Sequence, residues 1–437
     1  MANKMHTLLK IPTSVARVAI VIVNNIYCIP TYLVWMGLLS PLKMIQPTMF
    51  YKIEGIFFHW LLAVVSMWSY SAGYDIVEVG DDIEECMDKK TLVMANHQST
   101  GDVPLLMANF NAKESVLPNI MWIMDRLFKY TNFGAVSVIH EDFFISSGRN
   151  NRDKAIDDLR VHLADSFIKN DRKWMVLFPE GGFLHKRRSV SQRYIEKMNL
   201  PPLEYVTLPR IGALRAIFDV MVTQNSPTNE ERRVSCDKME NGDLPPNTSI
   251  LLSNNFSPTN FHQASKIQEE NPLLLTSNDV VVTTNSNHEI DNSNSTSPNT
   301  KRSEVVQNNL LEYILDITIA YPDRKPVDLP NIVHGWRDPC KTHMLYRLYK
   351  VAEIPTELEE LTQWLYDRFY EKNELLENFY KSGQFFVNRT VNSNVIHQDN
   401  LRLLLINLFF ITSTYFHYQI LSVCYKYCVA YIAQSVS

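Results

Sequence analysis

The sequence lacks a strong net charge, and it lacks the cysteine patterns that hold zinc. Its 437 residues carry a formal net charge of −5. No overall basic field is available for nucleic acid, and we expect no nucleic-acid partner. The six cysteines form no CxxC pair and no Cys/His cluster with zinc spacing. The sequence therefore predicts reduced, structural thiols and no metal site.

No small-residue cleavage site follows the first apolar run, which argues against a removable signal peptide. This run, Val18–Leu39, is uncharged and 22 residues long, enough to cross a hydrocarbon core roughly 30 Å thick. Basic residues precede it, so we predict a retained transmembrane anchor with a cytosolic N-terminus. Because Asn24, Asn25 and Pro30 interrupt the run, a re-entrant helix is the alternative.

Two further apolar runs follow in a chain that is 46% hydrophobic. Ile56–Ala72 is shorter and interrupted by His59, whereas Leu403–Ala433 carries only Lys426 as a charged residue. We interpret both as membrane segments. The alternative for each is a buried core helix, which periodicity alone does not distinguish.

Between these runs, short β-rich segments alternate with helical ones, a pattern typical of an α/β domain. Helices are predicted at Arg152–Lys169 and Glu357–Tyr380, where apolar residues recur on one face. Strands are predicted at residues 75–79, 91–95, 121–124, 135–139, 173–178, 205–208, 314–321 and 344–349.

The composition changes at residues 223–303 to Asn, Ser, Thr and Pro, which predicts a disordered insertion. The predicted organisation is therefore a set of five segments. Residues 1–73 form membrane-anchoring helices, 74–222 a domain with the catalytic motifs, 223–303 the insertion, 304–381 the rest of that domain, and 382–437 a hydrophobic membrane segment.

The first candidate motif is NHQSTGD, residues 96–102, directly after the predicted strand TLVMA. His97 at the end of a strand and Asp102 at the start of a helix can meet across the turn. Asp102 would then fix the imidazole tautomer, while the other ring nitrogen takes a proton from a hydroxyl. The alternative is that Asp102 only caps the helix and His97 bonds a loop carbonyl.

The second candidate motif is FPEGG, residues 178–182, again where a predicted strand ends. Glycine lets backbone N–H groups approach an anion, and the basic residues that follow offer charge for phosphate. Glu180 is poorly suited to lie beside phosphate, so we expect it to position a basic side chain or a substrate hydroxyl. The alternative is an ordinary turn followed by a solvated charge run. The basic residues are Lys186, Arg187 and Arg188.

The two motifs together carry a family resemblance. NHQSTGD resembles the NHxxxxD motif, and FPEGG the FPEG motif, of the glycerol-phosphate and lysophospholipid acyltransferases, in that family's order and at about its spacing. Longer stretches resemble the acyl-CoA:lysophosphatidylglycerol acyltransferase branch. These are MWIMDRLFKYTNFGAVSVIH, RKWMVLFPEGGFLHKRRSVSQRY, NLPPLEYVTLPR and DITIAYP.

The resemblance implies an α/β fold with a mixed sheet flanked by helices, and with membrane helices at both ends. It also implies a site in which His97 is the general base and Asp102 orients it. Glu180, Gly181 and the fourth-motif pair Pro209 and Arg210 would bind the acceptor. Acyl-CoA and a lysophospholipid would be the substrates, without a metal or other cofactor, at the endoplasmic reticulum membrane with a cytosolic catalytic face.

The sequence departs from the family pattern in two places. The second family motif usually ends in Arg after a strand that begins with Gly, but here the predicted strand from Gly134 reaches His140 and Glu141. Arg149 is the candidate substitute. After FPEG, many relatives carry Thr or Ser and then Arg, where this chain has Gly182 and Phe183. The basic residues at 186–188 would then supply the missing charge.

The predicted function is transfer of an acyl chain from acyl-CoA to a lysophospholipid such as lysophosphatidylglycerol, at the bilayer. A CoA-independent phospholipid transacylase could use the same His/Asp pair. A hydrolase of acyl thioesters would need no lipid acceptor, and a non-catalytic lipid-binding scaffold would need neither His97 nor Asp102.

Overall fold

A computed structural model describes residues 2–113, 115–146, 152–222, 310–385 and 392–436. The predicted insertion at 223–303 lies outside the described residues. Within them, eight strands form one mixed sheet in the order β4-β3-β5-β2-β6-β7-β1-β8. The strands are β1 (Tyr74–Gly80), β2 (Thr91–Ala95), β3 (Ile120–Asp125), β4 (Phe143–Ile145), β5 (Trp174–Leu177), β6 (Tyr313–Ala320), β7 (Cys340–Lys350) and β8 (Asn392–Val395).

Strands β4, β3, β5, β2 and β6 run parallel to one another, whereas β7 is antiparallel to β6, and β8 is antiparallel to β1. All five residues of β2 and all eight of β6 are buried. Such fully buried central strands are expected where helices cover both faces of a sheet. The predicted α/β fold with a mixed sheet is therefore confirmed.

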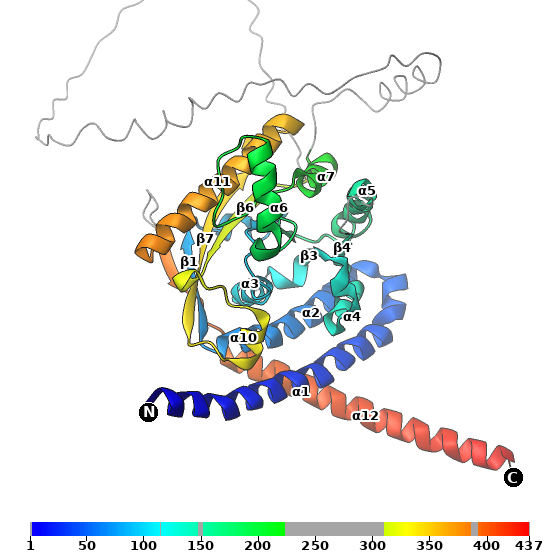
Figure 1. Ribbon diagram of the computed structural model, residues 1–437. Coiled ribbons are helices and arrows are strands. Elements are labelled where there is room, and N and C mark those ends of the chain that lie inside the picture. The colour runs from blue at the N-terminus through cyan, green and yellow to red at the C-terminus, as the bar shows by residue number, and fades with distance from the viewer. Residues whose placement is uncertain (1, 114, 147–151, 223–309, 386–391, 437) are drawn as a thin grey trace, which may run out of the picture. The chain divides into compact units, whose positions relative to one another are not determined.

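Helices cover both faces of the sheet (Figure 1). One core cluster packs α2 (Pro47–Tyr70) and α3 (Asp102–Asn111) on the sheet, and a second packs α5 (Arg152–His162), α7 (Ile211–Met221) and α11 (Leu358–Ser382). The other α-helices are α1 (Ala2–Ile45), α4 (Asn132–His140), α6 (Leu184–Lys197), α10 (Leu329–His334) and α12 (Asn400–Val436). Short 3-10 turns are η1 (Glu84–Cys86), η2 (Leu117–Asn119), η3 (Arg126–Tyr130), η7 (Pro322–Arg324) and η8 (Val351–Glu353), and η5 (Leu163–Ile168) is a π-helix that continues α5.

Three helices are long and apolar enough to cross a membrane, by length and composition. They are found at Lys10–Ile45 in α1, Pro47–Tyr70 in α2 and Asn400–Gln434 in α12. They coincide with the three apolar runs of the sequence. The window in α2 is the most buried of the three, at 56%, because this helix packs against α3 and η2 of the sheet domain.

Two predicted strands are wrong. Residues 135–139 lie in α4, where Thr131 caps the helix by accepting the Gly134 N–H and so overrides the β-propensity of Val136 and Val138. Residues 205–208 form no strand, because their N–H groups bond side chains in place of a neighbouring strand. Thr207 N–H donates to Glu180 and Leu208 N–H donates to Ser191.

The parallel order of β5, β2 and β6 positions the candidate motifs. β2 pairs in parallel with β5 on one side and with β6 on the other. The carboxyl ends of parallel neighbours meet at one edge of a sheet, where ligands commonly bind in α/β folds. The residues that follow these three strands, near 97, 178 and 321, therefore lie together.

Candidate functional site

The first motif forms a tight turn between β2 and α3. His97 Nδ1 lies 2.8 Å from Asp102 Oδ2, so the two side chains meet across the turn as their spacing predicts. A carboxylate only accepts hydrogen bonds, so Nδ1 carries the proton and Nε2 is left as the basic nitrogen. The His97 side chain is 12% exposed while that of Asp102 is fully buried, so the imidazole is the accessible member of the pair.

Asp102 is held by four donors. Its Oδ2 also accepts the N–H groups of Gln98 and Ser99, at 2.7 Å and 2.9 Å. Its Oδ1 accepts the hydroxyl of Tyr321 at 2.5 Å. Tyr321 is fully buried, and burial raises its pKa well above the usual value, so it stays a protonated donor. The carboxylate therefore has one fixed orientation toward His97.

The ring of His97 is held by two aromatic side chains, one in the second motif and one directly after it. It stacks on Phe178 with centroids 4.1 Å apart, and Phe183 lies at 4.3 Å. The carbonyl of His97 also accepts the Leu184 N–H at 2.8 Å. The two motifs therefore form one structural unit, and stacking restricts rotation of the imidazole.

Glu180 lies beneath this unit and is 1% exposed. Its Oε1 accepts the His97 N–H at 2.6 Å, and its Oε2 accepts the Thr207 N–H at 2.8 Å and the Thr207 hydroxyl at 2.7 Å. Burial raises the pKa of Glu180 to about 7, although the hydrogen bonds from Thr207 and His97 lower it. With protein donors on both of its oxygens, Glu180 fastens the His97 turn to the 205–210 segment.

Two glycines form the accessible turn of FPEGG. Gly181 has φ 68° and Gly182 has φ 149°, values that L side chains rarely adopt. A Cβ on Gly181 would lie 3.3 Å from Arg210 Cδ, and one on Gly182 would lie 3.3 Å from Arg187 Cδ. The side chains of Arg210 and Arg187 therefore flank the glycine turn.

The three basic side chains at 186–188 have different surroundings. Lys186 is exposed with Nζ 5.4 Å from the centroid of the Phe183 ring, and Arg188 donates to the Glu204 carbonyl at 2.7 Å. Arg187 is partly buried, burial lowers its pKa, and its Nε has no hydrogen-bond partner among the described residues. Of the three, Arg187 is the side chain that lies against the glycine turn.

The remaining predicted residues have separate positions. Pro209 is buried, and the N–H of Arg210 donates to the Pro179 carbonyl at 2.8 Å. The fourth motif thus lies beside the second. Arg149, the candidate substitute for the second-motif Arg, lies outside the described residues.

Sequence reasoning missed Tyr321 and Thr207. Tyr321 comes from DITIAYP, a segment that had been noted for family resemblance but given no role. A signal was present, because this tyrosine ends a buried strand as His97 and Phe178 do. Its contact with Asp102 depended on β6 being the parallel neighbour of β2, which a single sequence does not specify.

The assembled site combines a partly exposed imidazole with two arginine side chains that flank the adjoining glycine turn. An imidazole oriented by a buried carboxylate can take a proton from a hydroxyl near neutral pH. Guanidinium groups bind phosphate through charge-assisted hydrogen bonds. The arrangement therefore suits activation of a hydroxyl on a phosphate-bearing molecule.

The chain is similar to known acyltransferases. Residues 77–205 match the family model described as "Acyltransferase", and residues 331–411 match "Acyltransferase C-terminus". The human acyl-CoA:lysophosphatidylglycerol acyltransferase 1 is 35% identical over 412 residues, covering 94% of this chain and 94% of that protein. Its mouse counterpart is 36% identical with the same coverage. Lysocardiolipin acyltransferase 1 of Gallus gallus is 36% identical over 80 residues, covering 18% of this chain and 21% of that protein.

Proposed function

The chain belongs to the acyltransferase family, and on that premise we propose that it transfers a fatty acyl chain from acyl-CoA to the free hydroxyl of a lysophospholipid. The family resemblance drawn from the sequence is confirmed. Lysophosphatidylglycerol is the first acceptor to test, since it is named for the human and mouse relatives that this chain matches over 94% of their lengths.

The observation that carries the mechanism is the 2.8 Å contact between His97 and Asp102. We propose that His97 Nε2 removes the proton of the acceptor hydroxyl as its oxygen attacks the thioester carbonyl. The C–O bond forms, the C–S bond breaks, and CoA leaves as a thiol with the proton returned by His97. Asp102 stabilises the imidazolium that exists between these steps.

Arg187 and Arg210 are proposed to bind phosphate. Both substrates are anionic, and both side chains lie against the glycine turn within the unit that holds His97. Gly181 and Gly182 keep that turn free of side-chain atoms. The proposal places the phosphate group beside the turn and leaves Glu180 in a positioning role.

The three long apolar helices support a membrane protein whose acceptor and product stay in the bilayer. We propose the endoplasmic reticulum as its location and the cytosol as the side of the catalytic domain. Supply of acyl-CoA makes that side the simpler arrangement.

An acceptor-panel assay tests the proposed function. Purified protein with labelled acyl-CoA should label phospholipid when lysophosphatidylglycerol or a related lysolipid is added. Label released as free fatty acid without an acceptor would indicate a thioester hydrolase. Acyl transfer between phospholipids without CoA would indicate a transacylase, and no turnover on any acceptor would indicate a lipid-binding scaffold.

Tyr321→Phe is expected to lower kcat by roughly five- to tenfold, because Asp102 then loses one of the four donors that fix its orientation toward His97. Initial rates at saturating substrate measure the effect. The matched control is Tyr380→Phe, because the Tyr380 hydroxyl bonds Gln98 and lies in the same neighbourhood. A variant with lower stability but an unchanged kcat would make Tyr321 a structural residue only.

Arg187→Ala and Arg210→Ala are each expected to raise KM for one anionic substrate by roughly tenfold, the equivalent of one charge-assisted hydrogen bond. The effect on kcat should be smaller, because a bound phosphate contacts the enzyme equally in ground and transition states. Arg188→Ala serves as control, since Arg188 is engaged by the Glu204 carbonyl. Equal effects at all three positions would disprove the specific placement of the phosphate.

A further inference from the structure

A hollow lies on the surface of the sheet domain where β7 begins. Its volume is about 650 Å³, which falls in the usual range of small-molecule sites. The start of β7, the turn η7 after β6 and the end of α11 border it, and we call it the β7 hollow. Six of the residues that line it supply positive charge or ring surface, namely Lys325, Arg337, Lys341, His343, Phe379 and Tyr380.

The β7 hollow lies at the same edge of the sheet as the candidate site. β6 ends at Ala320, which pairs with His343 of β7. The hydroxyl of Tyr380 accepts a hydrogen bond from Gln98 at 3.3 Å, and Gln98 directly follows His97. In the strand order β2-β6-β7, two strand spacings separate β2 from β7, a distance of roughly 10 Å. The hollow is therefore a neighbour of the catalytic turn and not a part of it.

Positive charge predominates in the hollow. Both Lys325 and Lys341 are exposed, and within the described part of the chain no acceptor or carboxylate engages their ammonium groups. Arg337 adds a third cation, against the two carboxylates of Asp323 and Asp338. Asp338 is already paired with Lys10 of α1. The balance of charge favours an anionic ligand.

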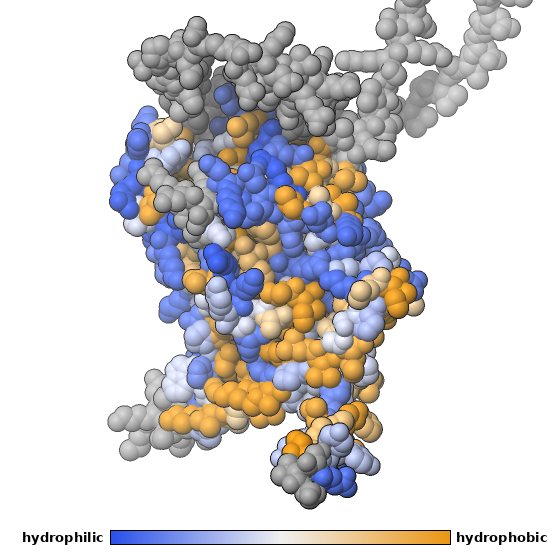
Figure 2. Space-filling view, turned by 90° about the vertical axis from the view of Figure 1, so that its right-hand side faces the viewer, coloured by the Kyte–Doolittle hydropathy of each residue, from blue (hydrophilic) through white to orange (hydrophobic). Residues whose placement is uncertain are grey.

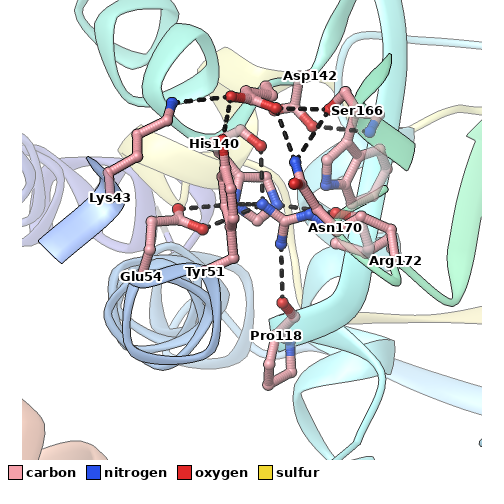
Figure 3. Close-up of polar contacts among 12 residues, drawn as sticks. Lys43, Tyr51, Glu54, Pro118, His140, Asp142, Ser166, Asn170 and Arg172 are labelled. Atoms are coloured by element: carbon pink, nitrogen blue, oxygen red, sulfur yellow. Dashed lines mark hydrogen bonds and ion pairs between the residues drawn. The ribbon is translucent and has the colours of Figure 1, made fainter. Parts of the chain in front are cut away.

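Charged side chains that stabilise the fold have a different environment. Glu54 of α2 is fully buried, and its carboxylate lies 2.7 Å from His140 Nδ1 and 3.0 Å from Arg172 (Figure 3). Arg172 also donates to the Pro118 carbonyl at 3.0 Å. Buried groups that satisfy one another in this way leave no place for a ligand. The lysines of the β7 hollow face solvent and can donate to an incoming phosphate.

The wall of the hollow is held in place by Arg337. Its guanidinium donates to the carbonyl of Lys325, and to that of Pro322 at 3.4 Å. These bonds connect the segment before β7 to the segment after β6. The hollow is therefore formed before a ligand arrives, which lowers the entropy cost of binding.

Aromatic rings form one side of the hollow. Phe379 and Tyr380 lie near the end of α11, and the ring of His343 lies 5.0 Å from that of Phe379. The Nδ1 atom of His343 is buried and has no hydrogen-bond partner among the described residues. Buried polar atoms are normally satisfied, so this nitrogen is available to a polar group of a ligand. Rings beside cations suit a nucleotide, which has a flat base and phosphate groups.

Acyl-CoA is amphiphilic, so its site should lie where polar and apolar surfaces meet. In Figure 2, hydrophobic residues gather in the lower half of the face shown, the level at which Figure 1 places α1, α2 and α12, and hydrophilic residues dominate the upper half. Asp338, which lines the hollow, pairs with Lys10, the first residue of the apolar segment Lys10–Ile45. The hollow therefore borders the apolar region while its own lining is mostly polar.

We propose that the β7 hollow binds the nucleotide end of acyl-CoA, with its phosphate groups on Lys325 and Lys341 and its adenine ring on Phe379 and Tyr380. The inference rests on the proposed use of acyl-CoA as the donor. The pantetheine arm separates the nucleotide from the thioester, so the thioester extends along the edge of the sheet to His97.

This placement assigns the two anionic substrates to separate cationic groups. The nucleotide phosphates take the lysines of the β7 hollow, and the acceptor phosphate takes Arg187 and Arg210 beside the glycine turn. Both substrates can then be bound at once, as direct transfer between them requires.

Binding of adenosine 3′,5′-bisphosphate, which carries ribose phosphates of CoA but no thioester, tests the hollow without turnover. Lys325→Gln and Lys341→Gln are made singly and together in the full chain. Calorimetric titration of the purified proteins should show Kd raised roughly tenfold or more in the double variant, the equivalent of at least one charge-assisted hydrogen bond. An unchanged Kd, or no binding by the wild type, would overturn the proposal.

Lys350→Gln is the matched control for Lys341→Gln. Lys350 lies at the other end of β7, is exposed like Lys341, and pairs with Glu85 at 3.4 Å. The control removes the same charge outside the hollow, so its Kd should equal that of the wild type. Equal losses at both positions would show that overall charge attracts the nucleotide, and would refute a site in the hollow.

Two acyl donors identify the substrate that occupies the hollow. The double variant should have a raised KM for acyl-CoA but the wild-type KM and kcat for an acyl-pantetheine thioester, which lacks the nucleotide. Wild-type kcat with that donor also shows that the variant is folded. A raised KM for the lysophospholipid alone would place the acceptor head group in the hollow and contradict the proposal.

The hollow and the proposed function fail in different ways. If the double variant loses nucleotide binding but the wild type transfers no acyl chain from acyl-CoA, the nucleotide site stands and the proposed reaction is wrong. If the wild type transfers acyl chains from acyl-CoA and the double variant binds the nucleotide as tightly, the reaction stands and the hollow is not the nucleotide site.

Discussion

Replacing His97 with alanine is expected to lower kcat by about 10²- to 10⁴-fold, the usual range for loss of a general base. The variant keeps Asp102, Tyr321 and the stacked phenylalanines but has no group that can take the hydroxyl proton. KM should change little, because the imidazole is proposed to act on the reacting proton and the arginines on phosphate. Initial rates with labelled acyl-CoA and a saturating lysophospholipid measure the effect.

Two controls accompany this experiment. The His97→Ala protein should stay in the membrane fraction and unfold at a temperature close to that of the wild type, which separates catalysis from folding. Asp102→Asn should also be slow, because its amide presents a donor where Gln98 and Ser99 already donate. Wild-type turnover by His97→Ala would disprove the mechanism.

Lys372→Met is expected to destabilise the protein by about 3–5 kcal/mol, the typical cost of leaving one member of a buried ion pair unpaired. Lys372 Nζ lies 2.8 Å from Asp316, and their side chains are 1% and 4% exposed. Burial raises the pKa of Asp316 and lowers that of Lys372, so each depends on the other to stay charged. Thermal or denaturant unfolding in detergent measures the loss.

Helix α11, which carries Lys372, also supplies the control variant. Lys381 pairs with Glu377 in α11, and both side chains are exposed, so Lys381→Met should leave the unfolding transition essentially unchanged. Combining Lys372→Met with Asp316→Leu should recover most of the lost stability, since no buried charge then remains. Equal losses in the single and double variants would show that packing volume, and not charge, sets the cost.

Local signals predicted much of the fold and of the site. β2 was predicted with the bounds that the structure gives, and β1, β3, β5 and β6 were placed within about one residue at each end, because short β-branched runs between turns are distinctive. The meeting of His97 with Asp102 was also predicted, since it depends on five residues of one turn. Contacts between residues that are close in the sequence can be recognised from short sequence patterns.

Features that depend on tertiary neighbours were not predicted. Nothing in FPEGG showed that Glu180 would bond the His97 N–H and Thr207, so it was expected only to position a basic side chain or a substrate hydroxyl. A strand was predicted at 135–139, but these residues are helical, because the Thr131 cap outweighs their β-propensity.

Strand β6 enters the chain after residues 223–309, yet it lies in the middle of the sheet between β2 and β7, and β1 pairs with β7 in turn. It also brings Tyr321 to Asp102. One cut within 223–309 would therefore yield two fragments, the first with His97 and Asp102 and the second with the strand and tyrosine that complete their surroundings. The two fragments, expressed separately, are suited to split-enzyme complementation. Recovered acyl transfer would then report that the fragments have reassembled.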